Sequence, residues 1–208
     1  MKRVALAAIT ASLLIAAPVA AVSTWTIDPA HTKAQFAIRH MMVSTVRGTL
    51  GKVTGVITID TENIPNSTVE ATIDATAIDT HEPKRDTHLK SPDFFDTAKY
   101  PTITFKSTAV EKLVNDEFQV TGNLTMHGVT KQVILFVQGT PDGINDPFGN
   151  VRLGGVVNAK INRQDFGITW NKTLDSGGTL VGNEVAVTID VELIKQTKPA
   201  AGGAAGGF

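Results

Sequence analysis

Histidine is the residue type in this sequence best suited to acid–base or metal chemistry, and the chain holds five: His31, His40, His81, His88 and His127. No pair has the His-x-His or His-Glu-x-x-His spacing that brings two imidazoles to one metal ion. His81 and His88 are seven residues apart in a polar segment. A shared helix face with a carboxylate such as Asp86 would allow a metal-dependent, hydrolase-like enzyme, with His127 as a further candidate ligand. The alternative interpretation is that these are surface histidines.

The residues for most other catalytic chemistries are missing. Cysteine is absent, which excludes thiol nucleophiles, thiolate zinc sites and disulfides. There is no Gly-x-Ser-x-Gly elbow, no phosphate-binding loop and no dinucleotide glycine pattern. Carboxylates such as Glu70, Asp74, Asp190 and Glu192 fall on outward positions of the strands described below, which is typical of a solvated surface. We therefore expect no catalytic residues, no metal and no cofactor, and a protein that is not an enzyme.

His40 stands at the end of an apolar strand face. Phe36, Ile38 and His40 share parity, so they point to one side of an extended chain. One interpretation is a core histidine with a satisfied hydrogen bond. The other is a polar group at the end of an apolar cavity, where it would bind the head of an amphiphile. Met41 and Met42 follow directly, and their flexible thioethers suit either a ligand chain or an ordinary core.

Arg163 lies in a turn-like segment, residues 162–171, that also carries Asp165, Phe166 and Trp170. Its guanidinium can pair with Asp165 or receive an anionic head group. The alternative is structural: the arginine would lock a corner of the fold, with the two aromatic side chains as a lid. The sequence leaves both interpretations open.

The elements that must position these side chains are β-strands, because apolar and polar residues alternate over most of the chain. The alternating runs are Lys33–His40, Val53–Asp60, Thr68–Ala77, Thr102–Val110, Glu117–Met126, Gln132–Gln138, Val151–Asn162 and Glu184–Leu193, with shorter runs at Trp25–Ile27 and Arg47–Leu50. Residues 80–100 are polar and lack alternation, so this connection is predicted to hold one or two short helices. The fold class is therefore all-β.

Many antiparallel strands with one apolar face each favour a closed barrel or a sandwich. An eight-stranded barrel has an interior that can hold one small ligand. Membrane barrels show the same alternation, but they carry aromatic girdles at both interfaces. With only 6% aromatic residues, this chain is predicted not to span a membrane.

The two ends of the chain differ from its middle. Residues 1–21 have a basic start, an apolar stretch from Val4 to Ala17 and small residues before the expected cleavage point, which predicts a signal peptide. Residues 22–197 form the predicted domain, and residues 198–208 a flexible Gly/Ala tail. Loss of Lys2 and Arg3 changes the charge to 17 − 20 = −3, which argues against nucleic acid as a partner.

Six segments, in order along the chain, resemble the YceI-like family: Trp25–Thr32, Phe36–Gly48, His88–Asp96, Tyr100–Phe105, Gly122–Lys131 and Ile161–Ile168. The resemblance extends roughly from Trp25 to Lys195. It implies an extended antiparallel β-barrel similar to lipocalins, located in the periplasm and linked to lipid handling and stress. It also implies a long cavity for a polyisoprenoid or related amphiphile, such as an isoprenoid quinone, a polyprenyl phosphate or a fatty acid derivative. A homodimer is left open.

Parity and the resemblance together give a set of expected ligand-binding residues. The expected apolar lining is Phe36, Ile38, Met41, Met42, Ile73, Phe94, Phe95, Ile103, Phe105, Phe118, Phe136, Phe166, Ile168 and Trp170. His40 and Arg163 are expected to contact the ligand's head group.

Overall fold

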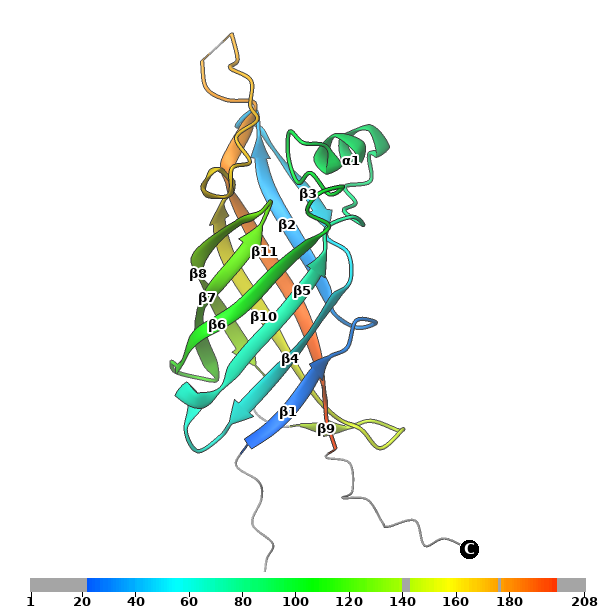
Figure 1. Ribbon diagram of the computed structural model, residues 1–208, viewed down its shortest axis with the longest axis vertical. Coiled ribbons are helices and arrows are strands. Elements are labelled where there is room, and N and C mark those ends of the chain that lie inside the picture. Colours follow the sequence, from blue (N-terminus) through cyan, green and yellow to red (C-terminus); the bar gives the residue numbers. More distant parts are fainter. Residues whose placement is uncertain (1–21, 140–142, 176, 198–208) are drawn as a thin grey trace, which may run out of the picture.

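The computed structural model describes residues 22–139, 143–175 and 177–197. Over these residues the chain forms an antiparallel sheet closed into an elongated barrel, with one short α-helix at one end (Figure 1). The predicted signal peptide and the predicted tail from residue 198 lie outside the described residues. No helix in the described part of the chain is long and apolar enough to cross a membrane.

The described strands follow the alternating runs of the sequence closely. In chain order they are β1 (Val22–Ile27), β2 (Lys33–His40), β3 (Ser44–Thr49), β4 (Val53–Asp60), β5 (Thr68–Asp74), β6 (Thr102–Lys112), β7 (Glu117–Met126), β8 (Val129–Gly139), β9 (Ile144–Asn145), β10 (Val151–Asn162) and β11 (Val181–Lys195). Two 3₁₀ helices, η1 (Ile64–Asn66) and η2 (Arg163–Phe166), and the helix α1 (Pro83–Lys90) complete the elements. The prediction of an all-β barrel with a short helix between residues 80 and 100 is confirmed.

The last strand, β11, holds the barrel together. Its first part pairs with β2, its end pairs with β1, and its other edge pairs with β10, which closes the sheet. β1 and β2 thus act as one interrupted strand beside β11. β4 and β3, which pair with β1 and β2 respectively, form the next interrupted strand of the sheet. Counting β1 with β2 as one strand, counting β3 with β4 as one strand, and leaving out the short edge strand β9 gives 11 − 2 − 1 = 8 strands. The barrel is therefore eight-stranded.

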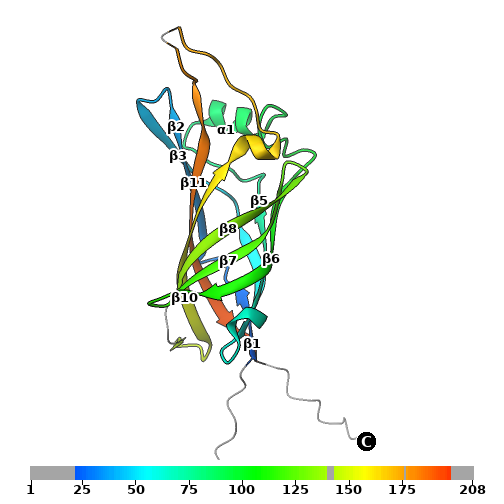
Figure 2. The ribbon, with the colours of Figure 1, turned by 90° about the vertical axis from the view of Figure 1, so that its left-hand side faces the viewer.

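One end of the barrel is covered by α1, η2 and the loop that follows η2 (Figure 2); we call it the α1 end. Helix α1 begins at Pro83, where a missing N–H costs nothing, and Glu82 accepts a hydrogen bond from the backbone N–H of Lys84. The other end carries β9 and the turn between β6 and β7, and we call it the β9 end. The best-buried apolar cluster lies at the α1 end and includes Phe94, Ile103, Met126 and Phe166.

Several strands are a few residues longer than the alternating runs, such as β8 and β11, and two differences have a local cause. β5 ends at Asp74 instead of continuing to Ala77, because the Asp74 carboxylate accepts hydrogen bonds from the N–H and the hydroxyl of Thr76 and so forms a turn. Strand β9 has only two residues, which is too short for alternation to be visible.

Candidate functional site

An apolar cavity of about 960 Å³ runs through the barrel. Its lining extends from Ser23 and Lys195 near the β9 end to Arg163 and Trp170 at the α1 end, so it follows the long axis of the molecule. The strands contribute their inward side chains, most of which are Val, Ile, Leu and Phe. This volume lies near the top of the usual range for ligand pockets, about 300–1,000 Å³.

Most of the residues expected to bind a ligand line this cavity. They are Phe36, Ile38, Ile73, Phe94, Phe95, Ile103, Phe105, Phe118, Ile168 and Trp170, together with the two expected head-group residues His40 and Arg163. Alternation placed the strand residues of this set on the inward face because successive side chains of a strand point to opposite sides. Contact of any of them with a ligand stays a prediction.

Phe136 does not line the cavity and needs a correction. It lies on the outer face of β8, where its relative exposure is 51%. The register explains this: Phe136 stands opposite Gln119 on β7, whereas its neighbour Leu135 stands opposite the buried Val120. Directly opposed residues share a face. Residues 133–137 are apolar at both parities, so alternation alone did not determine which of them point inward.

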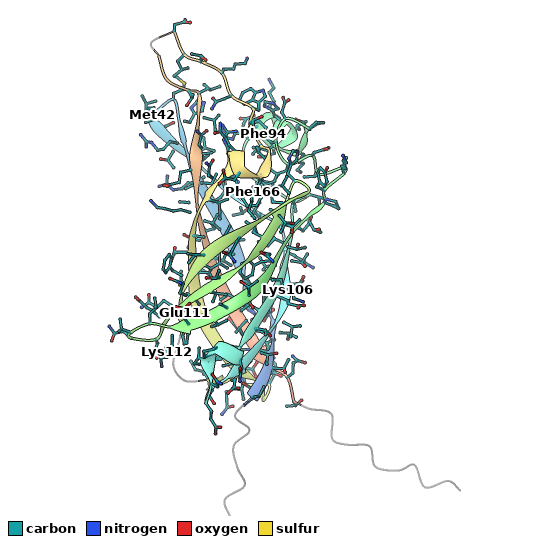
Figure 3. All side chains as sticks on the ribbon, turned by 60° about the vertical axis from the view of Figure 1, so that its left-hand side comes forward. Met42, Phe94, Lys106, Glu111, Lys112 and Phe166 are labelled. Carbon is teal, nitrogen blue, oxygen red and sulfur yellow. The ribbon has the colours of Figure 1, made fainter. Side chains whose placement is uncertain are left out.

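Met41 and Met42 also lie outside the cavity lining. They form the turn between β2 and β3, where both adopt left-handed backbone angles, with φ of 52° and 62°. Both side chains are exposed, Met42 to 66% (labelled in Figure 3). The apolar face of β2 therefore ends at His40, because the chain reverses at the next residue.

Phe166 is the third correction. It is only 1% exposed and packs in the apolar cluster at the α1 end, with Ala159, Ile161 and Ile168 among its members, but it does not line the cavity. Figure 3 shows it in η2, near Phe94 at the same end of the molecule. Its position at the end of a 3₁₀ helix makes it an anchor of the corner that carries Arg163.

Three rings meet where α1 faces the end of the cavity. His88 lies edge-on to both Phe94 and Trp170, with ring centroids 5.0 and 4.9 Å apart. The centroids of Phe94 and Trp170 are 5.2 Å apart. Edge-to-face pairs at these distances stabilise the packing. All three residues line the cavity, so α1 is fixed to the barrel by side chains that also close its interior.

Arg163 is buried, with a relative exposure of 3%, and its guanidinium binds the backbone of its own corner. Nε donates to the carbonyl oxygen of Gly182 at 2.8 Å, and Nη1 donates to those of Ile168 and Trp170 at 2.7 and 2.9 Å. Nη2 lies 3.4 Å from Oδ1 of Asn183. No carboxylate lies within 4 Å of it among the described residues, and burial lowers the pKa of the guanidinium. Asp165, the pairing partner considered from the sequence, is exposed instead.

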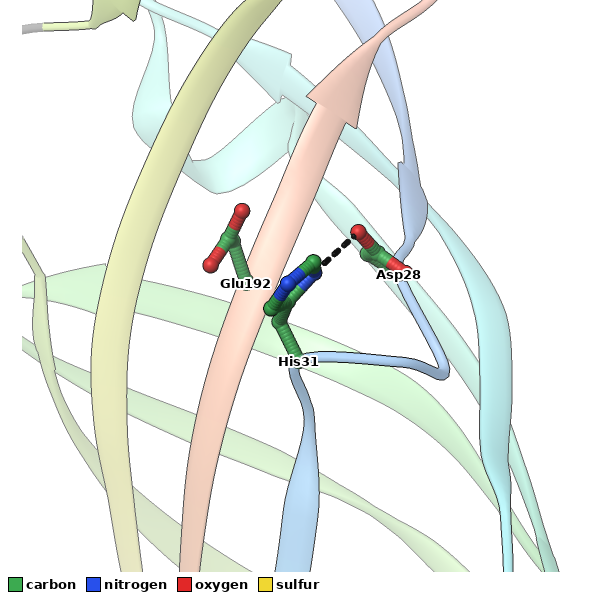
Figure 4. Close-up of side chains that lie close together, drawn as sticks. All are labelled: Asp28, His31 and Glu192. Atoms are coloured by element: carbon green, nitrogen blue, oxygen red, sulfur yellow. Dashed lines mark hydrogen bonds and ion pairs between the residues drawn. The ribbon is translucent and has the colours of Figure 1, made fainter. Parts of the chain in front are cut away.

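A second polar cluster lies on the outside of the barrel and was missed by the sequence reasoning. Arg152, at the start of β10, donates to Asp28 at 2.8 Å, to Asp146 at 2.7 Å and to Glu192. His31 Nδ1 lies 2.8 Å from Oδ2 of Asp28 (Figure 4). The hydrogen bonds from His31 and Arg152 lower the pKa of Asp28 to about 2. The three carboxylates around Arg152 in turn raise the pKa of its guanidinium. The cluster ties the interruption between β1 and β2 to β10 and β11.

Asp28, His31 and Glu192 place one possible metal-ligand atom each within 4.8 Å of one another, and this is the one such group of three among the described residues. Nη1 of Arg152 bonds both carboxylates, so a cation already occupies the place between them. The group includes none of the histidines considered for an enzyme. His81 is exposed beside Asp79, and Nε2 of His88 lies 2.8 Å from Asp93. Nδ1 of His127 lies 3.1 Å from the carbonyl oxygen of Phe166.

Comparisons with known proteins agree with the fold. A family model described as a YceI-like domain matches residues 25–193. Protein YceI of Escherichia coli O157:H7 is 39% identical over 198 residues, which cover 94% of this chain and 100% of that relative.

Two solved structures show the same architecture. The YCEI protein of Campylobacter jejuni is 29% identical, with a TM-score of 0.64 over 77% of this chain and 91% of that chain. A polyisoprenoid binding domain from Saccharophagus degradans shares the fold at 16% identity, with a TM-score of 0.58 over 83% of this chain and 98% of that one. The match of the family model and the identity to the curated relative together show that the chain belongs to the YceI-like family.

Proposed function

We propose that the protein is a periplasmic carrier or store for a polyisoprenoid or a related amphiphilic lipid, which it holds in the barrel cavity. The observation that carries this proposal is the cavity itself, about 960 Å³ of elongated, apolar space inside a closed barrel. The polyisoprenoid binding domain from S. degradans, which shares the fold, supports it. The predicted signal peptide at residues 1–21 supports export.

The shape and polarity of the lining favour an amphiphile over a compact polar metabolite. Along the middle of the barrel the lining is apolar, whereas Arg85, His88 and Arg163 line it at the α1 end and Lys112 and Lys195 at the β9 end. Each methylene moved from water into such a space contributes about 0.8 kcal/mol. An amphiphile with a long hydrocarbon chain fits this cavity, because the chain can lie along the apolar middle and the polar head can lie among the charged side chains at one end.

The direct test is to recover the ligand. The full chain is expressed with its leader, released by osmotic shock without detergent, purified, and examined by native mass spectrometry and organic extraction. We expect a co-purifying lipid with a long hydrocarbon chain. Protein without a bound lipid that also fails to take up added polyprenyl compounds would contradict the proposal.

A matched pair of variants tests whether the lipid lies inside the barrel. Val157 lines the cavity, whereas its neighbour Val156 stands opposite Asp190 and does not. Val157→Trp should fill the middle of the cavity and remove most of the co-purifying lipid. Val156→Trp places the same ring on the outer face and should retain it. Equal lipid content in the two folded variants would show that binding takes place elsewhere.

A further inference from the structure

We propose that the ligand carries an anionic head group, a phosphate or a carboxylate, and that this head lies at the α1 end of the cavity beside Arg163. This inference rests on the proposed function, because it specifies the class of lipid and its orientation.

The first observation is a buried cation without a counter-ion. Arg163 lines the cavity and is 3% exposed, yet no carboxylate lies within 4 Å of it in the described parts of the chain. Its partners are carbonyl oxygens and the side-chain amide of Asn183. These groups supply dipoles but no negative charge. A buried charge is costly unless it is paired, so the site favours an anion from outside the protein.

The second observation is geometric. The hydrogen bonds to Gly182, Ile168, Trp170 and Asn183 use Nε–H, both hydrogens of Nη1 and one hydrogen of Nη2. A guanidinium has five N–H donors, so among the described residues one hydrogen of Nη2 is left for a ligand. Because Nε–H and both hydrogens of Nη1 are anchored to backbone carbonyl oxygens, the guanidinium is held in place, and a charge-assisted hydrogen bond to the remaining Nη2 hydrogen would be short and strong.

The third observation is the charge of the surrounding lining. At the α1 end the cavity is also lined by Arg85 and His88, and no carboxylate of the described residues lines it there. The carboxylates close to these two side chains lie outside the lining and have partners of their own. Asp86 accepts from the N–H and the hydroxyl of Thr80, and Asp93 pairs with Nε2 of His88.

The β9 end differs in this respect and gives the ligand an orientation. There the lining contains Lys112 together with Asp116, and the two form an ion pair of 3.7 Å. Lys195 lies over the ring of Trp25, 5.7 Å from its centroid, and is exposed to solvent. Because this end supplies a carboxylate of its own, an anionic head is favoured at the α1 end and the chain extends toward the β9 end.

Chain-matched lipids test the charge of the head. Mature protein is freed of lipid by unfolding, extraction and refolding, and its affinity is measured for geranylgeranyl monophosphate against geranylgeraniol and for palmitate against hexadecanol. We expect the anion to bind about tenfold tighter than the alcohol in at least one pair. Comparing the pairs distinguishes a phosphate from a carboxylate head. Equal affinities within both pairs would overturn this inference alone, whereas binding of none of the four lipids would overturn the proposed function as well.

Asn183→Asp tests the position of the head without removing any contact of the fold. Residue 183 is exposed, and its side chain lies 3.4 Å from Nη2 of Arg163, so the variant gives the arginine an internal counter-ion. We expect the preference for the anion to fall several-fold while the affinity for the alcohol is unchanged. Asn123→Asp, at an exposed position on β7, adds the same charge as a control and should leave the preference intact. An unchanged preference in Asn183→Asp would overturn the assignment to Arg163.

Discussion

Two arginines of this barrel are placed in opposite surroundings. Arg152 lies on the outside and contacts three carboxylates, which raise its pKa. Arg163 lies inside, its hydrogen-bond partners among the described residues are all neutral oxygens, and burial lowers its pKa. The protein thus supplies three carboxylates to Arg152, which joins segments of the chain, whereas none of the described residues supplies one to Arg163 at the cavity. The difference separates a structural ion network from a candidate binding group.

The largest effect that we expect concerns the apolar packing of η2, the 3₁₀ helix that also carries Arg163. Phe166 is the largest fully buried side chain of the described chain, and Phe166→Ala should lower the free energy of unfolding by about 3–5 kcal/mol, since it leaves a cavity in the cluster. Phe136→Ala, on the outer face, is the matched control and should cost less than about 1 kcal/mol. Urea unfolding followed by circular dichroism measures both. Similar losses would show that the corner is not held by its apolar anchor.

The next effect is the loss of Arg163 itself. Arg163→Met keeps the apolar stem but leaves the carbonyl oxygens of Ile168, Trp170 and Gly182 without their donors. Each buried polar group left unpaired lowers the free energy of unfolding by about 1–3 kcal/mol. Because water can reach some of these carbonyl oxygens in the loop, we expect a total loss of about 3 kcal/mol. Lipid-free protein is used for this unfolding measurement. A variant as stable as the wild type would mean that the arginine has no structural role and serves the ligand alone.

Removal of Arg152 should cost less than removal of Arg163, because the Arg152 side chain is 22% exposed whereas Arg163 is only 3% exposed. Arg152→Met leaves Asp28, Asp146 and Glu192 facing one another, so the melting temperature should fall. Adding Glu192→Gln to Arg152→Met should restore part of the loss by reducing the repulsion. If the double variant melts below the single one, charge repulsion is not what destabilises it.

The smallest effect is the pH dependence that Asp28 and His31 of the Arg152 cluster contribute. Asp28 has a pKa lowered from 3.8 to about 2, so its contribution to stability is present above pH 3.8 and lost as the pH falls through about 2. Asp28 raises the pKa of His31 above 6.5, so that contribution is complete below pH 6.5 and lost as the pH rises through the raised value. The difference in melting temperature between wild type and His31→Gln should be larger at about pH 5 than at about pH 9. A difference independent of pH would contradict this assignment.

Alternation predicted the faces of most strands because burial on one side of a sheet is a local property of the sequence. β2, β4, β7 and β10 begin and end at the residues that the pattern indicates. The pattern was ambiguous where both faces are apolar, as at Phe136, and where the chain reverses, as at Met41.

The polar networks were harder to predict from the sequence. Their members are far apart in the chain, or they are backbone groups, which every residue carries. Arg152 and Asp28 are separated by 124 positions, and only the register of β11 against β1 and β10 brings them together. The partners of Arg163 are mostly backbone carbonyl oxygens, which every residue carries. The sequence therefore allowed both a structural and a binding role for Arg163, and the structure shows the structural contacts directly.

The pairing of β11 with three other strands also has a consequence for the order of folding. This strand of 15 residues comes last in the sequence, yet β1, β2 and β10 all pair with it. The two ends of the barrel wall cannot join until residues 181–195 are available, so closure must follow completion of the chain. Such non-local pairing is associated with slow folding, in milliseconds to seconds. A chain that stays open until its last strand arrives would fit the proposed export, in which an unfolded chain passes a translocation channel before it folds.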